Sequence, residues 1–320
     1  EQPDHSMLAQ GYAPSRFTSN FEAEIDASEI TAIRLELLNH PNLPAGGPGR
    51  AISGLCALTD IKLNVENTED ATQKTTIKFT EATADFSNPR LQLNFPYEDQ
   101  KGVRGFTGPV SYAIDGDNST AWGIDAGPGR LNQPHEAVFR AEKPFGYQEG
   151  SKLTISLVQM HGGWNSDNNQ TMNLGRFRIS WSNSPQAQAD PVPDHVREIL
   201  AIPDAERTSR QQDQVFSYWR TTVPEWKTEN ERIEAIWKQH PEGTTQLVYQ
   251  ERPQPRQTHL LDRGDFLKQK QVVQPGVPGF LNSLPTDGPV NRLTFARWLV
   301  DRQSPTTARA IVNRVWQAYF

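Results

Sequence analysis

Hydrophobic and polar residues alternate in the first part of the chain with the period of two that is typical of half-buried β-strands. This alternation, or a composition rich in β-branched and aromatic residues, recurs in short segments separated by Gly, Pro and Asn. Many short strands separated in this way predict an antiparallel β-sandwich or barrel. The predicted strands lie at residues 17–25, 30–37, 59–65, 137–139, 153–158 and 177–181.

The pattern changes after Ser184. A stretch rich in Pro, Ala and Gln has the composition of a linker. Helical periodicity follows, and the spacing of Trp226, Ile233 and Trp237 places these three side chains on one helix face. Thr208 or Ser209 can cap the second helix. Helices are predicted at 196–202, 209–221 and 225–240, strand-like sequence at 245–267, and a Pro- and Gly-rich stretch at 274–289, before two terminal helices.

The last predicted helix begins at Ser304, which can act as N-cap, with Pro305 at the first helical position. Its apolar side carries two aromatic residues at the final positions, without a C-terminal cap. We therefore expect a truncated domain, and expect absent domains of the same polypeptide, or another chain, to pack on this helix. The apolar residues are Ile311, Val312, Val315, Trp316, Tyr319 and Phe320.

Composition and charge narrow the class of protein. The chain has 320 residues, enough for about two domains. Its 32 Lys and Arg against 38 Asp and Glu give a net charge of -6, so neither a nucleic-acid nor an anionic-membrane partner is favoured. The sequence contains no apolar run of the length that spans a membrane.

Cys56 is the single cysteine of the sequence. One cysteine excludes an internal disulfide, a cysteine-based zinc site and a Cys-x-x-Cys-His haem attachment within this chain. Because Cys56 lies in an apolar segment, we expect it to be a small buried hydrophobic residue rather than a reactive thiolate.

The segment 113–122 concentrates two carboxylates, a glycine, a hydroxyl and a tryptophan in ten residues. The glycine can take positive φ, so Asp115 and Asp117 can converge on one point with Thr120 and nearby carbonyl oxygens. Hard oxygen ligands of this kind suit calcium. The alternative is a tight turn in which the aspartates hydrogen-bond their own backbone. Trp122 is expected to pack inside the domain.

A long polar loop between two predicted strands carries one histidine and one tryptophan. An exposed indole can stack on the apolar face of a pyranose while polar side chains hydrogen-bond its hydroxyls. One interpretation is therefore a sugar-binding loop, and the other is a solvated loop whose tryptophan covers the edge of the sandwich. The candidate ligand-binding residues are His161, Trp164, Asn165, Asp167 and Asn168.

The sequence carries no recognisable catalytic motif. It has no Gly-x-Ser-x-Gly and no His-Glu-x-x-His, and its seven histidines lack metal-ligand spacing. A catalytic pair of carboxylates for glycoside hydrolysis could come together only in the folded chain, so the sequence leaves that possibility open. No catalytic residue is predicted, and whether the chain belongs to an enzyme is left open.

The segment 113–122, within a strand-rich region, resembles the discoidin-type, galactose-binding-like β-sandwich of carbohydrate-binding modules. In that family the Asp-Gly-Asp turn often holds a structural calcium. The resemblance implies calcium ligands at Asp115, Asp117 and Thr120. The further acidic ligand that some members carry near the domain end has no clear counterpart here.

Other motifs extend over nearly the whole chain. They are Leu8-Ala9-Gln10-Gly11-Tyr12-Ala13-Pro14, Leu43-Pro44-x-Gly46-Gly47-Pro48-Gly49-Arg50, Leu174-Gly175-Arg176-Phe177-Arg178, Pro275-Gly276-Val277-Pro278 and Arg292-Leu293-x-x-Ala296-Arg297-Trp298-Leu299-Val300-Asp301, continuing as Thr307-Ala308-Arg309-x-x-Val312-Asn313-Arg314-x-Trp316-Gln317. These motifs resemble large planctomycete proteins in which a c-type cytochrome domain precedes two planctomycete-specific domains of unknown function, with a sandwich inserted between those two. The haem-binding region and most of the final domain have no counterpart in this sequence.

Together, the patterns and resemblances predict a mainly β fold, an antiparallel jelly-roll-like β-sandwich followed by a smaller helix-rich α+β region. The expected divisions are a lead-in at 1–14, a galactose-binding-like sandwich at 15–184, a linker at 185–194, a helical and extended connecting region at 195–290, and the start of a C-terminal helical domain at 291–320.

The expected function is a non-catalytic, carbohydrate-binding module within a larger exported, periplasmic or extracellular, cytochrome-associated protein. One alternative is that the chain is part of a polysaccharide-acting enzyme or electron-transfer assembly. Another is that it is a structural subunit-contact domain. The expected ligands are a glycan and calcium.

Overall fold

A computed structural model of the chain describes residues 1–94, 97–98, 101–164, 170–241, 257–285 and 288–320. The chain divides into two units, Glu1–Gln246 and Leu247–Phe320.

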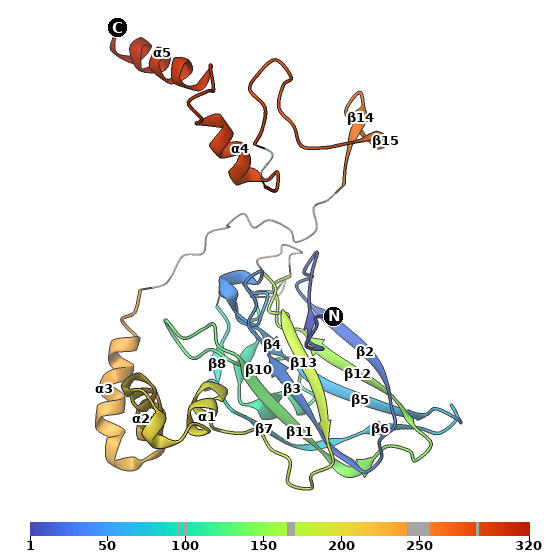
Figure 1. Ribbon diagram of the computed structural model, residues 1–320. Coiled ribbons are helices and arrows are strands. Elements are labelled where there is room, and N and C mark those ends of the chain that lie inside the picture. The colour runs from blue at the N-terminus through green and yellow to red at the C-terminus, as the bar shows by residue number, and fades with distance from the viewer. Residues whose placement is uncertain (95–96, 99–100, 165–169, 242–256, 286–287) are drawn as a thin grey trace. The chain divides into compact units, whose positions relative to one another are not determined.

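The first sheet of unit 1 has five strands, and every neighbouring pair is antiparallel. The sheet has the order β1-β13-β3-β11-β7 (Figure 1). The strands are β1 (Met7–Leu8), β13 (Arg176–Ser182), β3 (Ile30–Leu37), β11 (His135–Phe145) and β7 (Phe79–Ala84).

Two four-stranded sheets complete the β-structure of unit 1. One is antiparallel, in the order β2-β12-β5-β6, and the other has the order β4-β10-β9-β8, in which β10 and β9 run parallel. The first contains β2 (Phe17–Ile25), β12 (Ser151–Gln159), β5 (Asp60–Asn67) and β6 (Lys74–Ile77). The second contains β4 (Ala57–Leu58), β10 (Thr120–Gly123), β9 (Phe106–Gly108) and β8 (Leu91–Gln92).

The core forms where the inner faces of the sheets meet. Alternate residues of a strand point to the same face, so the apolar positions of β3, β5 and β12 gather on one side of each strand. Phe139 and Trp122 are almost completely buried in the same core. The strand residues of this core include Ile33, Leu35, Leu37, Leu63, Val65, Leu153, Ile155 and Leu157. The prediction of a mainly β sandwich followed by a helix-rich α+β region is confirmed.

The outer face of the five-stranded sheet carries a ladder of ion pairs. Arg178 donates two hydrogen bonds to the Glu36 carboxylate, at 2.8 and 2.7 Å, and Arg34 lies between Glu36 and Glu136. Burial alone would raise the pKa of Glu36, but the hydrogen bond from Arg178 and the nearby Arg34 charge outweigh it and lower that pKa. The charged side chains of neighbouring strands therefore stabilise one another across the sheet.

Two segments that were expected to lie outside the sandwich are part of it. β1, within the predicted lead-in 1–14, pairs with β13, and Asp4 accepts a hydrogen bond from Arg176 at 2.6 Å. In the predicted linker 185–194, Ala189 packs against β3 and β11, and its N–H donates to Thr83 at 2.8 Å. The linker composition did not reveal this packing because small apolar side chains suit a sheet surface as well as a loop.

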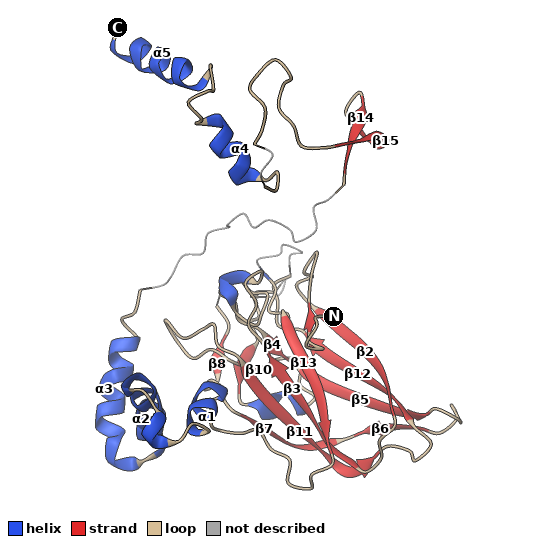
Figure 2. Ribbon diagram, in the orientation of Figure 1, coloured by secondary structure: helices blue, strands red, loops and turns tan. Residues whose placement is uncertain are grey.

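The three α-helices of unit 1, α1 to α3, are grouped to one side of the strands (Figure 2). The side chain of Thr208 accepts a hydrogen bond from the N–H of Gln211, and the Gln211 side chain bonds back to Thr208, a capping box at the predicted helix start. Trp226, Ile233 and Trp237 are half-buried on one face, as their spacing predicts. The helices are α1 (Asp194–Leu200), α2 (Ser209–Thr222) and α3 (Lys227–Trp237), and short 3-10 helices occur at Pro44–Gly46, Val110–Ile114, Asp204–Glu206 and Pro224–Trp226.

Arg130 fastens α3 to a loop of the sandwich. Its guanidinium donates to both carboxylate oxygens of Glu234, at 2.8 and 2.7 Å, and lies over the Trp237 ring. That hydrogen bond lowers the pKa of Glu234. Gly129 has a φ of 74°, and a Cβ there would lie 2.6 Å from the Trp237 ring, so only glycine permits this approach.

Unit 2 contains a β-hairpin and two helices. The hairpin is formed by β14 (Thr258–Asp262) and β15 (Asp265–Val273), and the helices are α4 (Arg292–Leu299) and α5 (Thr307–Tyr319). Part of the strand-like sequence predicted at 245–267 lies outside the described residues. No helix in the described ranges is long and apolar enough to cross a membrane.

The start of α5 differs from the prediction. Ser304 is not its N-cap: the N–H of Ser304 donates to Asp301 O at 2.9 Å, which holds the chain in a turn, and Thr306 precedes the first helical residue. The Ser304 hydroxyl instead contacts the Thr307 hydroxyl at 3.2 Å. A preceding turn thus displaces the helix start by two residues, a feature that the Ser-Pro pair alone does not show.

Replacing the arginine that fastens α3 should loosen this helix without unfolding the sandwich. Because the pair is bidentate but partly exposed, we expect Arg130→Ala to remove about 1 kcal/mol of local stability. Hydrogen exchange of the amides at 227–237 should accelerate. Arg232→Ala is the matched control, since Arg232 is exposed on the same helix and forms no ion pair within the described ranges. Equal exchange in the two variants would contradict the role of Arg130.

Candidate functional site

The Asp115 turn joins the 3-10 helix Val110–Ile114 to β10. The Asp115 carboxylate accepts hydrogen bonds from the Asp117 N–H and the Thr120 hydroxyl, both at 2.8 Å. Gly116 has a φ of 73° with open space around it, so the turn requires its backbone conformation rather than its small size. The aspartate therefore stabilises the turn from within.

Asp117 stabilises the next part of the same turn by a similar hydrogen bond to the backbone. Its carboxylate accepts a hydrogen bond from the Ser119 N–H at 2.8 Å, and this bond lowers the pKa of Asp117. The Thr120 hydroxyl also approaches the Asp117 carbonyl, at 3.1 Å. These contacts are those of the hydrogen-bonded turn that was the alternative to a calcium site.

The fit of the turn to calcium is incomplete. Calcium takes six to eight oxygen ligands, whereas the turn supplies two carboxylates and one hydroxyl that already bond to each other or to the backbone. Within the described ranges, no group of three or more His, Cys, Asp or Glu side chains could hold a metal ion. Calcium at Asp115, Asp117 and Thr120 stays a prediction, and backbone carbonyls or water would have to supply its remaining ligands.

Trp122, two residues after the turn, anchors β10 in the core. Its side chain is buried, as expected, and its indole N–H donates to the Phe86 carbonyl at 3.1 Å. A buried indole N–H needs an acceptor, so this bond both satisfies the N–H and fixes the orientation of the ring. The turn is thereby held at a fixed place on the sandwich.

His161 follows β12 and is buried. Its Nε2 lies 3.1 Å from the Phe106 carbonyl and its Nδ1 lies 3.2 Å from the Thr59 hydroxyl. A carbonyl only accepts, so in the neutral ring Nε2 carries the proton and Nδ1 accepts from Thr59. Burial lowers the pKa of His161, although the Phe106 carbonyl acts in the opposite direction. Both nitrogens of His161 are therefore engaged within the protein.

A pocket of about 420 Å³ lies where these two regions meet. It brings the Asp117 turn together with the His161 loop, and with loops before β2 and before β9. A Cβ on Gly105 would lie 2.5 Å from His161 Nε2, so this glycine allows the loop before β9 to pack on the histidine. The lining residues are Arg16, Tyr97, Val103, Arg104, Gly105, Asp117, Asn118, Ser119, Met160, His161 and Gly162.

Two arginines fasten the loops around this pocket, Arg16 between two loops and Arg104 within one. Arg16 Nε donates to the Gly162 carbonyl at 3.3 Å, and Arg104 Nε donates to the Glu98 carboxylate at 3.1 Å. Sequence reasoning did not find Arg16, Tyr97 or Arg104, because they lie on two loops far apart in the chain, in segments without any motif. Only the pairing of the strands brings them together.

The remaining predicted ligand-binding residues lie next to this pocket in sequence. The Trp164 side chain is 59% exposed, and its backbone N–H donates to the Glu98 carbonyl at 3.0 Å. The tryptophan loop is thus attached to the Glu98–Arg104 loop, which lines the pocket. Asn165, Asp167 and Asn168 lie outside the described residues.

Comparison with known families finds a match at one end of the chain. Residues 291–320 match the PSD1 family, described as a protein of unknown function (DUF1553). It is a planctomycete-type domain, and the match covers α4 and α5. No curated protein matches the chain. No solved structure matches it either, so the comparisons give no support to a discoidin-type insertion.

The buried histidine should make stability depend on pH. Burial holds the folded-state pKa of His161 below the ordinary value for a histidine, so the unfolded chain takes up this proton first. The histidine should therefore reduce the free energy of unfolding as pH falls from about 7 towards the folded-state pKa. In His161→Gln this part of the slope should vanish, as measured by denaturant titration at several pH values. His5→Gln, at an exposed histidine, is the control.

An ion-binding turn and a hydrogen-bonded turn respond differently to calcium. If the turn binds calcium, millimolar calcium should raise the melting temperature, and Asp115→Ala should abolish the rise. Asp70→Ala, in another turn where the carboxylate bonds its own backbone, should keep the rise. An unchanged melting temperature of the unsubstituted protein would leave the turn with a purely hydrogen-bonded role.

Proposed function

We propose that unit 1 is a non-catalytic ligand-binding module whose pocket between the Asp117 turn and the His161 loop takes carbohydrate. The observation that carries the proposal is the pocket itself, because it joins the two regions that the sequence singled out separately. Its volume of about 420 Å³ is within the range of small-molecule sites.

The lining suits a hydroxyl-rich ligand. Asn118 and Ser119 offer both donors and acceptors, which is what sugar hydroxyls require. Tyr97 adds a half-buried ring, and burial raises the pKa of its phenol, which therefore stays neutral and can donate or accept. The Trp164 backbone N–H donates to the Glu98 carbonyl, and the exposed indole of Trp164 offers a flat apolar surface on which a sugar ring can stack.

Two residues with reactive side-chain chemistry, His161 and Cys56, are engaged or enclosed by the protein. Both nitrogens of His161 bond to protein groups. Cys56 is buried in the core, and burial raises the pKa of its thiol to about 12, so the thiolate form is suppressed at neutral pH. The geometry thus favours binding over chemistry in this part of the molecule.

We further propose that the chain is part of a larger, exported protein, in the periplasm or outside the cell; the family match supports only the planctomycete-type domain of unknown function at 291–320. The exposed apolar side of α5 favours a second role for unit 2, contact with another polypeptide segment. The exposed residues are Ile311, Val312, Val315, Trp316, Tyr319 and Phe320.

Glycan binding tests the proposed function directly. The complete chain is applied to an array of neutral and acidic polysaccharides, and ligands that bind are titrated by calorimetry. Trp164→Ala and Asn118→Ala should each weaken binding about tenfold, because each removes one side of the proposed contact. Trp181→Ala is the matched control, since Trp181 is a similarly exposed tryptophan on β13, outside the pocket. Absence of binding to every polysaccharide, or equal loss in all three variants, would contradict the proposal.

A further inference from the structure

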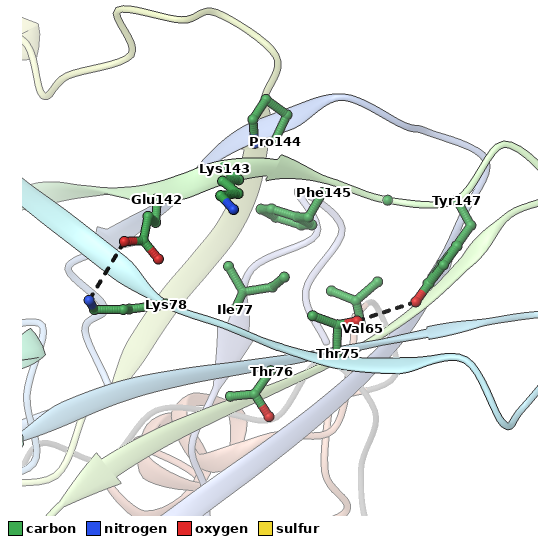
Figure 3. Close-up of a pocket in the computed structure, with 11 residues that line it drawn as sticks. Val65, Thr75, Thr76, Ile77, Lys78, Glu142, Lys143, Pro144, Phe145 and Tyr147 are labelled. Carbon is green, nitrogen blue, oxygen red and sulfur yellow. Dashed lines mark hydrogen bonds and ion pairs between the residues drawn. The ribbon is translucent and has the colours of Figure 1, made fainter.

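A second pocket, of about 410 Å³, opens at the edge of the sandwich where the chain passes from one sheet to the other (Figure 3). β6 is the last strand of its sheet, β7 begins the edge of the other, and only Lys78 separates them. The opposite wall is the end of β11, continued by Gly146 and Tyr147. Among the described residues, this pocket shares no lining residue with the pocket beside His161.

A bulge in β11 widens this edge. The pairing passes from Arg140 with Ala32 to Phe145 with Ile30, so β11 advances five residues while β3 advances two. Residues 141–144 have no partner on β3, although Ala141 still pairs with Phe79 of β7, and Glu142, Lys143 and Pro144 form a wall of the pocket. Gly146 then turns with a φ of 104° against the Ala27 carbonyl, at a position where a Cβ would lie 2.6 Å from that oxygen. The wall is therefore built into the backbone.

The floor of the pocket is apolar. Val65 and Phe145 are buried core residues, and Ile77 packs against the same core. At one end, the Thr75 and Tyr147 hydroxyls lie 3.4 Å apart and satisfy each other. Figure 3 shows Ile77 and Phe145 between this pair and the charged side chains at the other end. A ligand body over this floor would replace water on an apolar surface.

The charged end is positive. Lys78 and Glu142 form a long, largely exposed ion pair at 3.7 Å, which contributes little to stability. Lys143 has no ion-pair partner within the described ranges. The lining therefore carries two positive charges and one negative charge, although the chain as a whole has a net charge of -6. An anion would be drawn to this end and could compete with Glu142 for Lys78.

We propose that this pocket binds a small hydrophobic carboxylate. The ligand's single carboxylate is held by Lys143 and Lys78, and its aromatic or branched aliphatic body covers Ile77 and Phe145. The carboxylate gains a charged partner at the rim, where water still reaches it, and the body is desolvated at the floor. This site is independent of the carbohydrate pocket.

The charge requirement is tested with two probes of similar shape. The complete chain is titrated with 3-phenylpropionate and with the neutral 3-phenylpropan-1-ol, by ligand-observed NMR and calorimetry. The acid should bind about tenfold more tightly than the alcohol, as expected for one charge-assisted hydrogen bond. Equal affinities, or no binding of the acid in the millimolar range, would overturn the proposal.

Substitutions locate the binding. Lys143→Gln should weaken acid binding about tenfold and leave the alcohol unaffected. Lys62→Gln is the matched control, because Lys62 is an exposed lysine on β5 paired with Asp60, outside the pocket. Trp164→Ala should leave the affinity for the acid unchanged, which separates this site from the carbohydrate pocket. Undiminished acid binding in Lys143→Gln would show that the acid binds elsewhere and would refute the assignment.

Discussion

Burial of the inner faces of the two main sheets is the constraint on which unit 1 depends. Each large aliphatic or aromatic side chain removed from water contributes about 1.5–3 kcal/mol, and β3, β5 and β12 each present a row of such side chains to the same core. A register slip of one residue would turn those rows outward, so strand pairing is strongly fixed. Once it is fixed, the ends of the strands and their loops have fixed positions as well.

The two pockets arise in different ways from this fixed frame. The pocket beside His161 forms where four loops converge at strand ends, and each loop is fastened by a specific hydrogen bond, such as that from Arg16 to the Gly162 carbonyl. The pocket beside Lys143 forms at an edge where a bulge in β11 shifts its register against β3. In both pockets, a rigid backbone places a few polar groups around an apolar or aromatic surface. This arrangement is typical of ligand sites.

The residues most suggestive of chemistry have structural roles in this frame. Asp115 and Asp117 hold a turn, His161 links the Phe106 carbonyl to Thr59, and Cys56 fills the core. In the function that we propose, ligand recognition falls to their neighbours, Asn118, Ser119 and Tyr97. The family match covers only α4 and α5, so the functional inference for unit 1 is based on the geometry of its own residues.

The sequence by itself determined the elements whose signals are local. Alternation placed β2 and β3 at their observed bounds, the Thr208 capping signal placed α2, and an apolar context predicted burial of Cys56. Only the tertiary structure decided that the Asp117 turn meets the His161 loop, that residues 187–189 pack on a sheet, and that a turn delays α5 to Thr307. Periodicity and capping act within a few residues, whereas convergence of loops depends on strand pairing between segments far apart in the chain.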